Sequence, residues 1–299
     1  MTAYHQPVLL RESIEGLGIK PGGTYVDATF GGGGHSKAIL ENLENGRLLA
    51  FDQDEDALNN VLDDEHFILI NHNFRYLKNF LKYHQALPVD GILADLGVSS
   101  HQFDEAERGF SIRFDGPLDL RMNRRQKLDA KQVLNDYPEE KLQYILKEYG
   151  ELTNARAIAS AVAKSRNNKP FITFEDLRES LRHLEPKGKE NKFYARVMQA
   201  LRIEINQELE VLKDFLLQTA EVLKSGGRLV VISYHSLEDR LVKNFIKTGN
   251  FEGKVEKDFY GNPKVLFEAV NKKPVVPGDE EIRKNSRARS AKLRIAEKI

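Results

Sequence analysis

The chain has 299 residues, 40% of them hydrophobic and 30% charged, as in an ordinary globular protein with one large or two smaller domains. It contains no cysteine, which excludes disulfide bonds, thiolate nucleophiles and cysteine metal sites. The 45 basic and 45 acidic residues cancel, which argues against indiscriminate nucleic-acid binding but allows a local basic face. The sequence has no basic leader and no long apolar run, so we expect neither a signal peptide nor a membrane span, and a cytoplasmic location.

A strand followed by a glycine-rich turn organises the first part of the chain. After a short helical stretch that ends near Gly18, residues 24–28 form the first predicted strand. Four glycines, Gly31–Gly34, follow, and a predicted helix over 36–43 begins at once. This order is typical of a nucleotide-binding βα unit, because glycine lets a ligand approach the backbone and the helix start offers free N–H groups. Glycine runs also occur in plain turns, so the pattern alone is weak.

Three further predicted strands lead to polar or aromatic residues. Residues 47–51 end at Asp52, 67–70 are followed by Phe74, and 89–94 end at Asp95. An acid about 20 residues beyond a glycine loop is where a ribose diol is bound in dinucleotide folds. Strands that alternate with helices predict a parallel doubly wound α/β sheet, whose ligands bind at the carboxyl ends of the strands. Four candidate residues fall at such ends: Asp27, Asp52, Phe74 and Asp95.

The pattern changes after Asp104, because strand patterns are nearly absent until Arg228 while apolar residues recur at helical spacing. We therefore expect residues 105–193 to form an inserted α-helical domain between the two parts of the sheet domain, 1–104 and 194–299. The second part is predicted to contain a long helix over 195–223, a strand over 228–233, a helix over 237–248, and closing edge strands over 265–270 and 291–296.

Two clusters of basic residues stand out. The first is Arg121, Arg124, Arg125 and Lys127, and the second is Arg283, Lys284, Arg287, Arg289, Lys292 and Arg294. Clusters of this length are common on protein surfaces, so solvated charge and RNA binding remain equal alternatives for each.

Six motifs together resemble the RsmH (MraW) family over almost the whole chain. They are Asp27–Ser36, Asp95–Ser100, Glu107–Ser111, Asp115–Asp119, Gln199–Ile203 and His235–Arg240. Members of that family use S-adenosyl-L-methionine to methylate the N4 amine of a decoding-centre cytosine, position 1402, of 16S ribosomal RNA in the 30S subunit. The resemblance implies a class I methyltransferase with a Rossmann-like, mainly parallel seven-stranded sheet and an inserted helical domain for substrate recognition.

The resemblance also implies the roles of particular residues. Gly33, Gly34 and His35 match the cofactor loop, Asp52 the ribose ligand and Phe74 the residue beside adenine, while the remaining cofactor contacts match Asp95 and Gln102. Four places depart from the family pattern, and none of them is a proposed cofactor contact: His101, Lys192-Phe193, Met198 and Ser286.

The proposed chemistry asks for an acceptor near the target amine. The lone pair of cytosine N4 is delocalised into the ring, so an acceptor for its N–H would stabilise the positive charge that develops there. Asp95 is the best-placed carboxylate, although a role confined to cofactor binding or loop support stands beside the catalytic one. His35 and His235 are better explained by structural roles, and His5 is open. No His, Asp or Glu set has the spacing of metal ligands, so we expect no metal.

Three hypotheses remain from the sequence. The leading one is the cytosine-N4 methyltransferase, with Arg121, Arg124, Arg287 and Arg289 as candidate RNA contacts. A Rossmann oxidoreductase that uses NAD would share Gly31, Gly33 and Asp52 but would not need the Asp95 loop or the insert. A non-catalytic assembly factor of the small subunit that retains the fold is the third.

Overall fold

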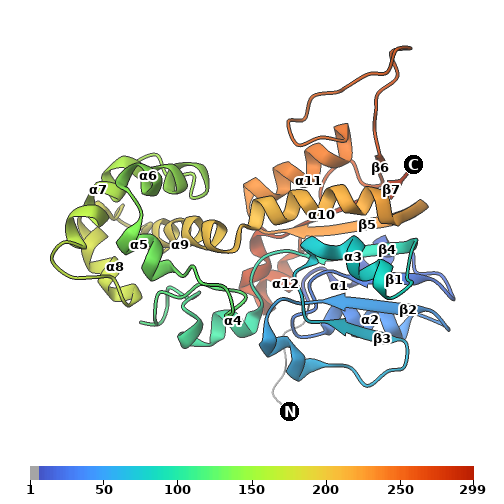
Figure 1. Cartoon of the computed structure of the whole chain (residues 1–299), viewed down its shortest axis with the longest axis horizontal. Helices are drawn as coiled ribbons and strands as arrows, with labels where there is room; N and C mark the ends of the chain where they lie inside the picture. The colour runs from blue at the N-terminus through green and yellow to red at the C-terminus, as the bar shows by residue number, and fades with distance from the viewer. Residues whose placement is uncertain (1–6) are drawn as a thin grey trace. The chain divides into compact units, whose positions relative to one another are not determined.

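The computed structural model describes residues 7–299, which divide into two compact units (Figure 1). The first unit combines the chain up to Gly97 with Leu209–Ile299, and the second is Val98–Glu208. His5 lies outside the described residues. No helix among those described is long and apolar enough to cross a membrane.

The first unit is built on a seven-stranded sheet. Its strands are β1 (Thr24–Asp27), β2 (Arg47–Phe51), β3 (Phe67–Ile70), β4 (Val89–Asp95), β5 (Leu223–Ser233), β6 (Phe267–Ala269) and β7 (Lys292–Lys298). They lie in the order β3-β2-β1-β4-β5-β7-β6. The first five strands run parallel, and β7 is antiparallel to both of its neighbours. The mainly parallel α/β sheet predicted from the sequence is therefore confirmed.

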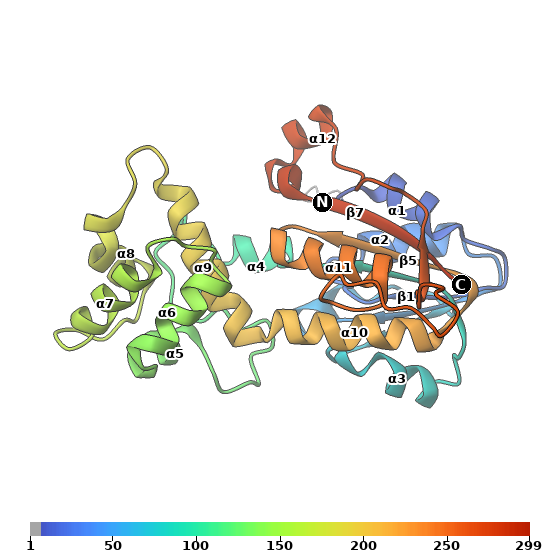
Figure 2. The same cartoon turned by 90° about the horizontal axis from the view of Figure 1, so that it is seen from above.

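Helices cover both faces of this sheet (Figure 2). They are α1 (Leu10–Leu17), α2 (Gly34–Glu41), α3 (Leu77–Tyr83), α10 (Glu208–Val222) and α11 (Ser236–Thr248). The short helix α12 (Asp279–Lys284) has no buried residue. Alternate strand residues explain the two layers, because Val26 and Leu49 share a core cluster with α3, α10 and α11, while Tyr25 and Leu48 share one with α1 and α2. Burial on both faces gives the strands their nearly continuous apolar sequences.

The second unit is helical and has its own hydrophobic core. Its helices are α4 (Ser100–Asp104), α5 (Ala130–Asp136), α6 (Glu139–Glu148), α7 (Ala155–Ser165), α8 (Phe174–Leu181) and α9 (Glu190–Asn206). The unit is longer at both ends than the insert expected over 105–193. Val98 and Phe103 pack against its core, and Phe193, Val197 and other apolar residues of α9 are buried in it. Periodicity identifies a helix but does not say which core it enters.

The single helix predicted over 195–223 is wrong. Gln207 adopts the left-handed conformation, with φ 51°, so that α9 ends at Asn206 and α10 begins at Glu208. The Gln207 N–H donates to the carbonyl of Ile203, as at an ordinary helix end. Glycine usually occupies such a position, and a glutamine there left no sign in the sequence.

Candidate functional site

The carboxyl ends of β1, β2 and β4 bring three aspartates to one edge of the sheet. Asp27 is aligned with Ala50 of β2 and Leu93 of β4, and Asp52 and Asp95 each lie two residues farther on. Asp27 is fully buried, which raises the pKa of its carboxyl. It accepts hydrogen bonds from the Ser36 hydroxyl at 2.7 Å and the Thr29 N–H at 3.0 Å. Asp27 therefore stabilises both ends of the glycine turn through hydrogen bonds.

Asp52 fixes the middle of the same turn. The Gly31 N–H donates to its Oδ2 at 2.7 Å, and the Asp54 N–H donates to its Oδ1 at 2.8 Å. Burial raises the pKa of Asp52 to about 6, against the opposing effect of these two hydrogen bonds. Each carboxylate oxygen has a second lone pair, so the group retains acceptor capacity for a ligand's hydroxyls.

The glycine turn cannot carry side chains at its key positions. Gly31 and Gly33 have φ of 53° and 76°, and a Cβ on Gly33 would approach the Phe30 ring to 3.0 Å. A Cβ on Gly34 would lie 2.3 Å from Pro7. Gly33 is the N-cap of α2, and no side chain caps that helix start. Backbone N–H groups at such a start favour a polar or anionic ligand group.

His35 is buried between Val8 and the end of β4. Its Nε2 lies 3.2 Å from the carbonyl oxygen of Val8, and its Nδ1 lies 3.8 Å from Asp95 Oδ2. Burial lowers the pKa of His35, so the ring is neutral at neutral pH. With Nε2–H donating to Val8, Nδ1 carries no proton and faces the carboxylate as an acceptor.

Asp95 is held through its backbone and one carboxylate oxygen. Its N–H donates to the Thr29 hydroxyl at 2.7 Å, and the Tyr234 hydroxyl donates to its Oδ1 at 2.8 Å. Burial raises the pKa of Asp95 to about 6, while the hydrogen bond from Tyr234 acts in the opposite direction. Sequence reasoning missed Tyr234. Its position directly after β5, at the same edge of the sheet, could have indicated that it lies near Asp95.

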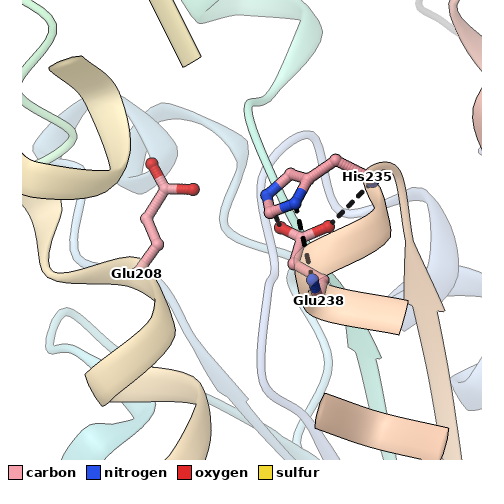
Figure 3. A group of neighbouring side chains, drawn as sticks. All are labelled: Glu208, His235 and Glu238. Carbon is pink, nitrogen blue, oxygen red and sulfur yellow. Dashed lines mark hydrogen bonds and ion pairs between the residues drawn. The ribbon is translucent and has the colours of Figure 1, made fainter. Parts of the chain in front are cut away.

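His235 is accounted for by helix capping (Figure 3). Its Nδ1 accepts from the Glu238 N–H at 3.4 Å, and Glu238 Oε2 accepts from the backbone N–H groups of His235 and Tyr234 at 3.3 and 2.9 Å. This is the structural role expected from the sequence. Glu208, also drawn in Figure 3, belongs to the second unit, where Arg202 donates to both of its oxygens at 2.8 Å.

Comparison with known proteins decides the family. The model of the MraW methylase family matches residues 2–299. The chain belongs to this family. Proteins called ribosomal RNA small subunit methyltransferase H are 59% identical to it in Christiangramia forsetii and in Flavobacterium johnsoniae, each over 297 residues that cover 99% of this chain and 98% of the relative. The relative from Bacteroides thetaiotaomicron is 58% identical over 296 residues, 99% of this chain and 97% of its own.

The family assignment inferred from the six motifs is confirmed, and the sheet is the class I methyltransferase sheet. A solved rRNA methylase from Streptococcus thermophilus is similar over 100% of this chain and 99% of its own length, at 13% identity and a TM-score of 0.45.

Phe74 and Gln102, which the sequence predicts as cofactor contacts, lie after β3 and in α4. Phe74 begins a 3₁₀ turn (Phe74–Tyr76) after β3 and packs edge-on against Phe215, with ring centroids 5.0 Å apart. Gln102 belongs to the second unit. It forms a reciprocal helix cap with Ser99, whose hydroxyl accepts from the Gln102 N–H at 3.2 Å.

The first basic cluster lies on a loop of the second unit. Asp119 and the backbone of the loop take up the hydrogen bonds of the Arg121 guanidinium, whereas Arg124 is exposed. Arg121 therefore stabilises the loop, and its contact with RNA stays a prediction.

The second basic cluster begins at the carboxyl edge of the sheet. Lys292 at the start of β7 pairs with Ser233 at the end of β5, so the preceding 3₁₀ turn (Ser286–Ser290) lies at that edge. Arg289 is exposed there, and Arg287 is half-buried. Lys292 and Arg294 instead bind Asp239, at 3.2 and 2.7 Å.

Proposed function

We propose that this protein transfers a methyl group from S-adenosyl-L-methionine to the N4 amine of cytosine 1402 of 16S ribosomal RNA in the small ribosomal subunit. The observation that carries the proposal is the full-length identity of 59% to proteins called ribosomal RNA small subunit methyltransferase H. The three aspartates at the carboxyl edge of the class I sheet supply a site of matching chemistry.

The residues of the first unit fit the methyl donor. Asp52 offers free lone pairs to the ribose hydroxyls, and its hydrogen bond with Gly31 ties that carboxylate to the turn. The open start of α2 at Gly33–His35 provides backbone N–H groups, and we assign Phe74 to adenine. When bound, the donor supplies an electrophilic methyl group on a sulfonium.

Asp95 suits the amine that receives the methyl group. A carboxylate near N4 can accept an N–H hydrogen bond and stabilise the charge that develops on nitrogen. Its pKa near 6 leaves it largely ionised at neutral pH while keeping it a stronger acceptor than an ordinary aspartate. We therefore assign Asp95 to the transfer step as well as to the cofactor.

The second unit suits recognition of the RNA. Its basic loop is held from inside, because Arg108 is buried and donates to the carbonyls of Arg121 and Met122. The fixed loop presents Arg124 to solvent, as the edge turn of the first unit presents Arg289. Contacts with phosphates would fix the register of the strand, while the site reads the cytosine.

The test uses 30S subunits from cells that lack the gene. The purified protein and S-adenosyl-L-methionine should add one methyl group, which mass spectrometry of RNA fragments should map to N4 of cytosine 1402; Asp95→Asn should abolish most of the transfer. Methylation at another nucleotide would reject the assigned position. Binding to 30S without transfer would favour the assembly factor, and tight binding of NAD in place of the methyl donor would favour the oxidoreductase.

A further inference from the structure

Tyr234 makes a hydrogen bond to the Asp95 carboxylate. It directly follows β5, whose pairing with β4 aligns Ile232 with Asp95. Its hydroxyl donates to Asp95 Oδ1 at 2.8 Å, and its backbone N–H donates to Glu238 Oε2 at 2.9 Å. The buried Glu238 thereby holds the backbone from which the phenol extends. The phenol is thus fixed at both ends.

The second carboxylate oxygen of Asp95, Oδ2, lies near His35. Asp95 Oδ2 lies 3.8 Å from Nδ1 of His35, too far for a hydrogen bond. His35 is held in place by its contact with the Val8 carbonyl, and its neutral ring presents an acceptor on that side. Among the described residues no hydrogen bond reaches Oδ2. Oδ2 is therefore the oxygen available to an incoming N–H donor.

We propose that Tyr234 is a positioning residue, which holds Oδ1 of Asp95 so that Oδ2 accepts the N–H of the target amine. The inference rests on the proposed function. In the transfer, the N4 lone pair forms the new N–C bond while the C–S bond breaks and its electron pair stays on sulfur. The amine proton then passes to Asp95 Oδ2 and on to water, which restores the carboxylate.

The groups around Asp95 determine the direction in which Tyr234 shifts the pKa of this carboxyl. Burial, followed by Asp27 and Glu238, raises the pKa of the Asp95 carboxyl, whereas the Tyr234 hydroxyl lowers it. Tyr234 itself has a pKa well above its ordinary value because it is buried near Asp95, Glu238 and Glu281, so it stays a donor at every working pH. Removing its hydroxyl should therefore raise the pKa of Asp95.

The first experiment compares the pH dependence of methyl transfer to 30S subunits in the wild type and in Tyr234→Phe. The acid limb of the wild-type profile should lie near pH 6, and that of the variant should lie about one pH unit higher, with activity at pH 6 reduced about fivefold. Activity above pH 8 should recover to within a few-fold. The variant should bind the methyl donor with wild-type affinity. This result would distinguish a positioning role of Tyr234 from a role in cofactor binding.

Tyr25→Phe is the matched control. The buried Tyr25 accepts a hydrogen bond from the Lys20 N–H at 2.7 Å in the same unit, and it is aligned with Gly91 of β4 and not with Asp95. The control should lose some stability, as Tyr234→Phe does, but keep the wild-type pH profile. An acid limb that stays in place in Tyr234→Phe, or moves equally in Tyr25→Phe, would overturn the positioning role.

The second experiment needs no RNA. Infrared difference spectra of the protein, titrated with acid and compared with Asp95→Asn, isolate the carboxyl band of Asp95. Its midpoint should lie near pH 6 in the wild type and higher in Tyr234→Phe. An unmoved midpoint overturns the role of Tyr234 whatever the activity. A shifted midpoint in a protein that methylates no 30S RNA supports the contact and overturns the proposed function alone.

Discussion

The guanidinium of Arg121 binds the carboxylate of Asp119 through two hydrogen bonds, from Nε at 2.7 Å and from Nη2 at 2.8 Å. Its remaining nitrogen donates to the carbonyls of Arg124 and Gln126. The side chain is only 22% exposed, and the pair lowers the pKa of Asp119. A side chain used in this way shapes the loop, whereas its neighbour Arg124 is free to meet a phosphate.

The two arginines of this loop should respond differently to removal. Arg121→Ala should lower the free energy of unfolding by about 1.5–3 kcal/mol, as expected for hydrogen bonds to a charged group. Arg124→Ala should leave the melting temperature unchanged and weaken binding to 30S subunits. Thermal denaturation and filter binding measure the two effects. Equal melting temperatures with equally weakened binding would show that both side chains face the RNA.

The edge turn of the first unit should contribute to the salt dependence of RNA binding. Replacing Arg287 and Arg289 with alanine should lower the slope of log K against log salt by roughly 0.7–0.9 for each phosphate that the variant no longer binds. Affinity for the methyl donor should stay near wild type. Filter binding across a salt series measures the slopes, with Arg11→Ala as an exposed control on α1. Coincident slopes for the double variant and the wild type would mean that the RNA is held elsewhere.

Much of the sheet could be predicted from the sequence. The third strand was predicted with its observed bounds, 67–70, and the first, second and fourth differ by at most one residue at an end. Buried parallel strands have short apolar sequences bounded by turn residues, so they are easy to recognise. The positions of Asp52 and Asp95 followed directly, because each ends a strand.

The remaining features depend on contacts that are distant in sequence. The helix break at Gln207 could not be predicted, because glutamine does not usually mark the end of a helix. The burial of α9 in the helical core depends on tertiary packing, which the spacing of apolar residues does not show. The contact between Tyr234 and Asp95 joins residues 139 positions apart. The engagement of Arg121 with Asp119 is local, but a run of basic residues does not show which of them is already paired.

Asp52 gives a direct test of the cofactor assignment. Asp52→Ala should weaken binding of S-adenosyl-L-methionine by ~1.5–3 kcal/mol, because the ribose hydroxyls lose a charged acceptor and the Gly31 N–H loses its partner. Isothermal titration calorimetry measures the change. Asp63→Ala, at an exposed aspartate of the same unit, should bind as the wild type does. Calorimetric affinity that is the same in Asp52→Ala and in the wild type would reject the ribose role.

The raised pKa of Asp95 predicts a stability that depends on pH. Because the folded-state pKa, about 6, lies above the ordinary value near 4, the native protein binds more protons than the unfolded chain between these values. The buried carboxyl therefore lowers the free energy of unfolding progressively as pH rises from about 4 to about 6. Above about pH 6 this destabilisation is fully present. Asp95→Asn keeps an acceptor for Tyr234 and removes the buried charge.

Asp95→Asn should therefore stabilise the protein at pH 8 by about 1–3 kcal/mol, and by much less at pH 4.5, where the native carboxyl is already protonated. The side chain is 21% exposed, so the lower part of this range is expected. Urea denaturation at the two pH values measures the difference. Asp63→Asn, at an exposed site, should show no such dependence on pH. If Asp95→Asn is less stable than wild type at pH 8, the charged carboxylate of Asp95 stabilises the folded protein. That result would contradict the prediction that burial of this charge is destabilising.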